Sequence, residues 1–93
     1  MLLMQVQSEN NYALTANKTV TRMYATNKTL KEAIALFKEY DALTAGRTMS
    51  PVTQRTLLSV TEVEELSVDE MKYMGITLIE GVLEAAKSHP AMQ

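Results

Sequence analysis

The sequence predicts a mainly α fold, a small helical domain of three to four helices with an extended or hairpin N-terminal arm. From residue 28 onward, apolar residues recur at the three- and four-residue spacing of amphipathic helices. Ser or Thr precedes Glu by three positions at several places, a pattern typical of helix starts. With 93 residues, 46% hydrophobic and 22% charged, the chain suits one modest globular core. We assign residues 1–26 to the arm or short hairpin and residues 27–93 to the helical domain.

The N-terminal 26 residues lack a helical pattern. Leu2, Met4 and Val6 alternate with their neighbours in a weak strand pattern, and residues 8–11 have the composition of a turn. Residues 15–29 are rich in Thr and Asn, whose side chains compete with helical hydrogen bonds. The segment is therefore expected to form a hairpin, or an arm that becomes ordered on a neighbouring subunit.

Two helices are expected before residue 67. The first spans residues 28–45, because Thr29 and Glu32 match a capping box and Gly46 is placed to end the helix in a left-handed conformation. A second helix is expected to start at Ser50 and Pro51, since proline is preorganised for the first helical position. Its end stays open between one kinked helix that reaches about residue 66 and two shorter pieces.

A third helix, expected from Ser67 towards Ser88, is the segment that predicts assembly into an oligomer. Apolar side chains cover more than half of its circumference, and such a helix is normally central. Two shorter helices are insufficient to cover it, so we expect a homo-oligomer. Gly75 and Gly81 are interpreted as points of close backbone approach. The expected oligomer interface consists of Met71, Tyr73, Met74, Gly75, Leu78 and Val82.

One segment combines cations with an aromatic ring and hydroxyl groups. Its members, the candidate ligand-binding residues, are Lys18, Arg22, Tyr24, Lys28 and Lys31. They are suited to an anionic nucleotide, although the same charges also describe an ordinary solvated face. Residues 1–58 carry a net charge of +3 and residues 59–93 one of −5, and the whole chain is acidic at −2. This balance argues against strong nucleic-acid binding.

Several chemistries are excluded or lack support. Without cysteine the chain has no disulfide, no thiolate nucleophile and no cysteine-based metal site. His89 is the single histidine and has no catalytic partners at a recognisable spacing. The acidic cluster over residues 62–70 lacks the glycine turn of a calcium loop. We therefore expect no enzyme, no catalytic residue, no cofactor and no metal. Neither a secretory signal nor a membrane span is recognised, so a cytoplasmic location is expected.

The leading hypothesis is a non-enzymatic helical oligomer that binds another protein, as phage or mobile-element accessory proteins and inhibitors do. Leu78, Gly81, Lys87 and Pro90 resemble the closing helix of small phage proteins that sequester cyclic nucleotides in helical oligomers. This resemblance, confined to residues 78–90, implies the first alternative, an oligomeric binder or sequesterer of an anionic small ligand such as a cyclic nucleotide. A weak nucleic-acid-binding protein is the second alternative.

Overall fold

The computed structural model describes residues 1–10, 18–47 and 51–88, and its fold is α/β. The expectation of a mainly α domain is wrong, because helix and strand each account for 41% of the fold. The elements in chain order are β1 (Leu2–Asn10), β2 (Lys18–Thr26), α1 (Leu30–Thr44), β3 (Val52–Glu62), α2 (Val68–Met74), β4 (Ile76–Leu78) and α3 (Ile79–Ser88). Among these described helices, none is both long and apolar enough to span a membrane.

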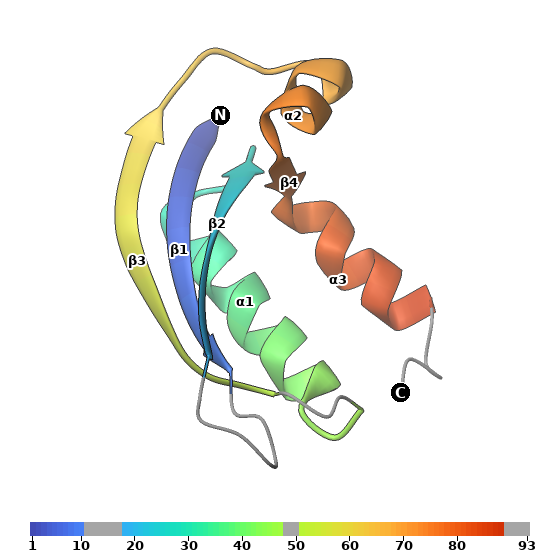
Figure 1. Cartoon of the computed structure of the whole chain (residues 1–93). Coiled ribbons are helices and arrows are strands. Elements are labelled where there is room, and N and C mark those ends of the chain that lie inside the picture. Colours follow the sequence, from blue (N-terminus) through green and yellow to red (C-terminus); the bar gives the residue numbers. More distant parts are fainter. Residues whose placement is uncertain (11–17, 48–50, 89–93) are drawn as a thin grey trace.

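The four strands form one mixed sheet in the order β3-β1-β2-β4 (Figure 1). β1 is antiparallel to both β2 and β3, whereas β2 and β4 are parallel. The N-terminal segment is therefore not a peripheral arm, because β1 and β2 form a hairpin whose strands are the two inner strands of the sheet. The weak alternation of Leu2, Met4 and Val6 reflects this, since Met4 and Val6 are buried while Gln5 between them is partly exposed.

Helices α1 and α3 cover one face of the sheet and pack against each other (Figure 1). Alternate residues of a strand point to opposite faces, so one set of strand side chains meets these helices. The resulting core consists of Met4, Val6, Tyr24, Ala33, Phe37 and Ile79. Burying each large apolar side chain stabilises the fold by about 1.5–3 kcal/mol, which makes this cluster the main attachment of both helices.

A second, smaller cluster involves α2. Ala25 of β2, Met71 of α2 and Ile76 of β4 are buried together, and Leu3 and Met23 pack against them. Because Leu3 and Ala25 alternate with Met4 and Tyr24, this cluster belongs to the opposite face of the sheet. Each face of β1 and β2 therefore contacts its own set of helices.

The prediction of a helix starting at Ser50 and Pro51 is wrong, because the chain forms β3 from Val52 onward. Ser50 lies outside the described residues, and Pro51 precedes the first residue of the strand. Five of the eleven residues of β3 are β-branched, and such side chains lose rotamer freedom in a helix but fit a pleated surface. They are Val52, Thr53, Thr56, Val60 and Thr61.

The prediction of one continuous helix from Ser67 towards Ser88 is also wrong, because the chain leaves the helix at Gly75. Gly75 has φ 69° and caps α2 in the left-handed conformation, after which the chain enters β4 and pairs with β2. The apolar rows expected along one helix are thus divided among α2, β4 and α3. Leu78 lies in β4, so the resemblance to a closing helix fails at that residue.

The two glycines of this region do not mark close backbone approaches within the chain. A Cβ added to Gly75 or to Gly81 would meet no packed neighbour within 4 Å in the part of the chain that the structure describes. The expectation of close packing at these positions is therefore not met by the fold of one copy. At Gly75 the glycine is required by the positive φ, whereas at Gly81 the space beside the helix is open.

Three capping boxes are expected from the sequence, and two of them are present, at Thr29 with Glu32 and at Ser67 with Glu70. The third, Thr61 with Glu64, is wrong, because Thr61 lies in β3. The C-terminal end of α1 differs from the expectation for Gly46, which does not have a positive φ. The helix instead ends at Thr44, with a right-handed cap at Ala45. Arg47 satisfies two terminal carbonyl groups, which removes the need for a left-handed glycine: its Nε donates to Leu43 at 3.0 Å and its backbone N–H to Thr44 at 2.9 Å.

The two glycines of the C-terminal region should respond oppositely to alanine. Gly75→Ala is expected to lower the free energy of unfolding by about 1–2 kcal/mol, because a Cβ is strained at positive φ. Gly81→Ala, the matched control inside α3, is expected to raise it by up to about 1 kcal/mol, since alanine favours the helix and the space is open. Urea denaturation followed by circular dichroism measures both. Equal stabilisation by the two substitutions would contradict the left-handed turn.

The α1 capping box should make stability depend on pH. Hydrogen bonds from the backbone N–H and hydroxyl of Thr29 hold the pKa of the Glu32 carboxyl below its ordinary value of 4.5. A carboxyl with a lowered folded pKa contributes stability above the unfolded pKa, and this is lost as pH falls through the folded value. Glu32→Gln should therefore lower stability at neutral pH and flatten its decline in acid. Denaturant titrations at neutral and acidic pH measure this, and Thr29→Ser, which keeps the hydroxyl, should retain the wild-type profile.

Candidate functional site

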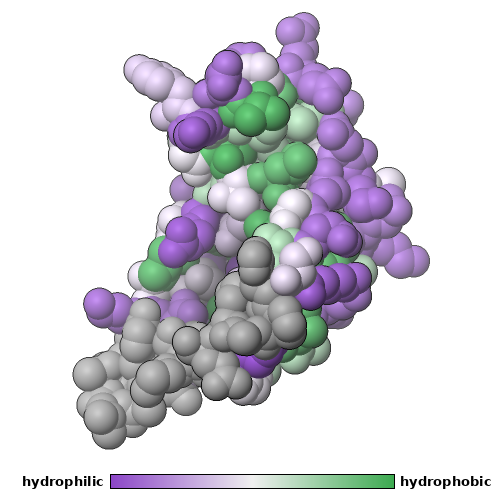
Figure 2. Space-filling view, turned by 90° about the vertical axis from the view of Figure 1, so that its right-hand side faces the viewer, coloured by the Kyte–Doolittle hydropathy of each residue, from purple (hydrophilic) through white to green (hydrophobic). Residues whose placement is uncertain are grey.

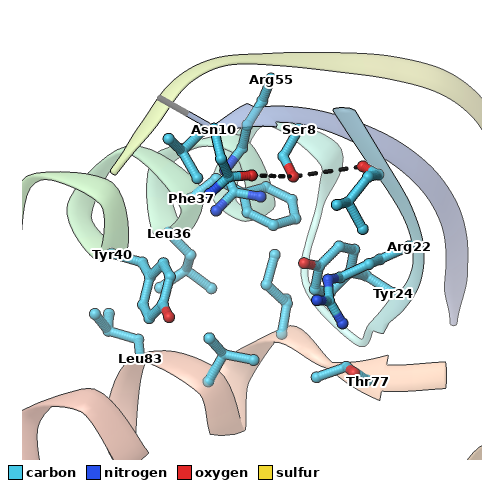
Figure 3. Close-up of a pocket in the computed structure, with 14 residues that line it drawn as sticks. Ser8, Asn10, Arg22, Tyr24, Leu36, Phe37, Tyr40, Arg55, Thr77 and Leu83 are labelled. Atoms are coloured by element: carbon cyan, nitrogen blue, oxygen red, sulfur yellow. Dashed lines mark hydrogen bonds between the residues drawn. The ribbon is translucent and has the colours of Figure 1, made fainter. Parts of the chain in front are cut away.

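A cavity of about 390 Å³ lies between the sheet and helices α1 and α3 (Figure 3). We call it the sheet–helix cavity. All four strands and both helices contribute side chains to its wall. Its apolar lining comes mainly from the helices, through residues such as Leu36 and Phe37 of α1 and Ile79 and Leu83 of α3. Polar groups come mainly from the strands. Small-molecule sites commonly combine an apolar wall with a few polar groups in this way.

The two central strands place their polar residues in the cavity by simple alternation. Ser8 and Asn10 of β1 and Arg22 and Tyr24 of β2 are each two residues apart, so all four side chains lie on the helix-covered face. Ser8 is buried, and its hydroxyl lies 3.4 Å from both the Asn10 Oδ1 and the Val20 carbonyl oxygen. These contacts are long, so they orient the Asn10 amide only weakly.

Arg55 of β3 is held rigidly at the wall of the cavity. Its guanidinium donates two hydrogen bonds to the Asp41 carboxylate of α1, at 2.8 and 2.7 Å. It also lies 4.8 Å from the centre of the Phe37 ring, and that ring meets Tyr24 edge to face at 5.0 Å. Bidentate pairing and the aromatic contact both fix the guanidinium plane. Arg55 therefore joins β3 to α1 and provides a fixed edge to the cavity.

The charge of Arg55 is largely compensated. Burial alone would lower the pKa of the Arg55 guanidinium, but the hydrogen bonds and charge of Asp41, with a smaller contribution from Tyr24, raise it instead. The side chains of Arg55 and Asp41 are 15% and 25% exposed, so solvent screens this pair only in part. The pair is consequently an ionic anchor, and most of its attraction for an outside anion is cancelled.

Arg22 differs from Arg55 because no carboxylate among the described residues pairs with it. Its side chain extends from β2 beside Tyr24, towards Thr77 of β4 (Figure 3). The described lining of the cavity contains no Asp or Glu. The rings of Tyr24 and Tyr40 stand on opposite sides of the space, each carrying a hydroxyl group. Among the described residues of the lining, Arg22 is therefore a solvent-exposed positive charge beside Tyr24 that has no carboxylate partner.

The structure divides the five candidate ligand-binding residues. Arg22 and Tyr24 line the sheet–helix cavity, whereas Lys18 lies at the start of β2 and is absent from the lining that the structure describes. Lys28 and Lys31 lie beyond the other end of β2, in the turn before α1 and in its first helical turn. Sequence reasoning missed Asn10, Tyr40 and Arg55, because their approach depends on pairing between strands that local patterns do not reveal.

The six residues of the expected oligomer interface are also dispersed. Met71 is buried in the α2 cluster, Leu78 packs against that cluster, Gly75 forms the turn and Val82 lines the cavity. Tyr73 and Met74 remain, with 93% and 56% of their surfaces exposed. Figure 2 shows apolar side chains among hydrophilic ones at the end of the molecule where α2 lies. Assembly through these residues stays a prediction, without the continuous helix that motivated it.

The metal-ligating side chains of the described residues are dispersed. Within residues 1–10, 18–47 and 51–88, no group of three or more His, Asp or Glu side chains is placed to hold a metal ion. His89 lies outside these residues. A scan of protein-family models and searches of curated proteins and of solved structures found no match to this chain.

Proposed function

We propose that this protein binds a small organic anion in the sheet–helix cavity. The ligand carries a phosphate or carboxylate group attached to a planar or apolar part. The observation that carries this proposal is Arg22, a cation without a described carboxylate partner, at the wall of a largely aromatic and aliphatic cavity. The volume of about 390 Å³ falls in the range of small-molecule sites.

The polar groups of the lining suit an anion better than a cation. A guanidinium presents N–H groups in a planar fork that matches phosphate and carboxylate oxygens. The hydroxyl groups of Tyr24 and Tyr40 supply further hydrogen-bond donors around the same space. A cation would meet Arg22 without any acidic side chain in the described lining, while the charge of Arg55 is already largely compensated by Asp41. The charge of the lining therefore favours a negatively charged ligand.

The apolar part of the wall narrows the ligand class further. Tyr24, Phe37 and Tyr40 offer aromatic surfaces, and Leu83 and Val82 offer aliphatic ones. A planar ring gains from stacking or edge contacts with such side chains. Nucleoside monophosphates, including cyclic ones, combine one anionic group with a planar base and so match this chemistry. The proposal assigns no catalytic step and retains the expectation of a cytoplasmic location.

The other hypotheses from the sequence have less support. Protein binding through a long terminal helix depends on an apolar surface that α2, β4 and α3 divide among them. Nucleic-acid binding depends on a run of neighbouring cations, but Lys28 and Lys31 lie beyond one end of β2 and Lys18 at the other. Both remain predictions that no observation favours over a small anion.

Ligand binding is expected to raise the melting temperature. A ligand at about 100 times its Kd stabilises the folded state by roughly 2.7 kcal/mol, which shifts the transition by several degrees. Thermal unfolding is measured with adenosine, guanosine, cytidine and uridine monophosphates, their cyclic forms and simple aromatic carboxylates. Arg22→Ala should weaken binding of the active compound by about 10- to 100-fold, the loss expected for hydrogen bonds to a charged group.

Lys31→Ala provides the matched control. It removes the same charge from an exposed position outside the cavity, so the affinity should stay within about twofold of wild type. Tyr40→Phe removes one hydroxyl and should cost less than Arg22→Ala. Isothermal titration calorimetry gives the affinities. The proposal fails if no compound of this panel shifts the melting temperature, or if the Arg22 and Lys31 variants lose binding equally.

A further inference from the structure

Strand β3 leaves one edge of the sheet open. It has eleven residues, and β1 is its one strand partner within the described part of the chain (Figure 1). Within residues 1–10, 18–47 and 51–88, no strand pairs with the backbone groups on the outer side of β3. Edge strands of monomeric proteins are usually protected by lysine, proline, short length or β-bulges. β3 contains neither lysine nor proline and is long, and its pairing with β1 has register shifts at Leu58 and near its start. The opposite edge, β4, has just three residues.

Apolar side chains accompany this open edge. Four of the large apolar side chains that remain exposed are Ile34 of α1 at 40%, and Leu57, Leu58 and Val60 of β3 at 40%, 48% and 37%. We call these four residues the β3 patch. A groove of about 460 Å³ runs between α1 and β3 and includes Ile34 and Leu57 in its wall. An open strand edge next to an apolar patch is typical of a surface that another chain covers.

We propose that a second copy of this chain covers the edge, with β3 of the two copies paired antiparallel about a twofold axis between Leu58 and Ser59. Leu57 then lies opposite Val60 of the second copy, and Thr56 opposite Thr61 of the second copy. The sheets of the two copies join into one sheet of eight strands. This inference concerns assembly and does not depend on the ligand proposed for the cavity.

The faces of β3 select this register. Leu57 and Val60 pair with Val6 and Met4 of β1, so both lie on the helix-covered side, and a register shift at Leu58 allows this uneven spacing. A twofold axis beside Leu58 places the register shift of one copy opposite the register shift of the other. Leu57 and Val60, both apolar, are then opposite each other. Shifting the pairing by one residue would set Leu57 and Val60 against residues of the other face.

Charge supports the same register. The six residues from Thr56 to Thr61 are uncharged, so the centre of the pairing brings no like charges together. Next to this uncharged segment, Arg55 lies opposite Glu62 of the second copy. By symmetry, Glu62 of the first copy lies opposite Arg55 of the second copy. Arg55 and Glu62 pair with Ser8 and Leu2 of β1, so both lie on the helix-covered side. Because Asp41 already compensates most of the charge of Arg55, the pair of Arg55 and Glu62 adds little attraction, but it also brings no like charges together.

Sedimentation and light scattering from low to high micromolar concentration test the assembly. The wild-type chain is expected to be a dimer, and Val60→Lys should raise the dissociation constant at least about tenfold, because it buries a charge against Leu57 of the second copy. Val68→Lys is the matched control, since Val68 is 75% exposed on α2 and away from β3. Circular dichroism verifies that each variant is folded. A wild-type monomer at every concentration, or a dimer unaffected by Val60→Lys, overturns the proposal.

Engineered thiols test the register without weakening the interface. The chain has no cysteine, so Thr56→Cys combined with Thr61→Cys introduces the two thiols that the register sets opposite each other. Directly opposed strand residues lie within the Cα separation that a disulfide spans, about 4.4–6.8 Å. Mild oxidation should give a covalent dimer on non-reducing electrophoresis. Each single variant is a control, because its two thiols are then five positions out of register. Equal cross-linking by a single variant overturns this register.

Discussion

The fold depends on β1, which is paired along its whole length with both β2 and β3. Its residues alternate so that Met4 and Val6 enter the core beneath α1 and α3, while Leu3 packs on the opposite face with the α2 cluster. One nine-residue strand therefore organises both hydrophobic clusters. Its helix-covered face also continues into Ser8 and Asn10, which form part of the cavity wall. Changes that disturb the alternation of β1 would disturb the two clusters and the cavity together.

Local signals in the sequence predicted some elements well. The Thr29 and Ser67 capping boxes are both present, because a cap depends on residues three positions apart and needs no distant partner. Arg22 and Tyr24, predicted to act together, both line the cavity, since they alternate on one strand, and their role in binding stays a prediction. In both cases the residues lie within one turn of helix or one short strand.

The errors arose where distant contacts decided the structure. Residues 76–78 carry a pattern that continues the helical one, yet they pair with Met23 and Ala25 about fifty positions earlier in the chain. Before β3, Pro51 is a local signal for a helix start, although the β-branched content of the following residues favours a strand. Tyr40 and Arg55 could not be assigned to a site, because their approach requires β3 to lie beside β1 and α1.

Arg55 links two regions that are otherwise separate. It is a residue of the open strand β3, it is bound to Asp41 of α1, and it forms part of the cavity wall. A small displacement of β3 on assembly would therefore be transmitted to the wall, and a molecule that repositions the wall would act on the strand edge. Thermodynamic linkage makes such an effect reciprocal: a ligand that favours the paired state must itself bind more tightly to that state. The Arg55–Asp41 ion pair would thus couple the two proposed events, ligand binding in the cavity and pairing of β3 with a second copy.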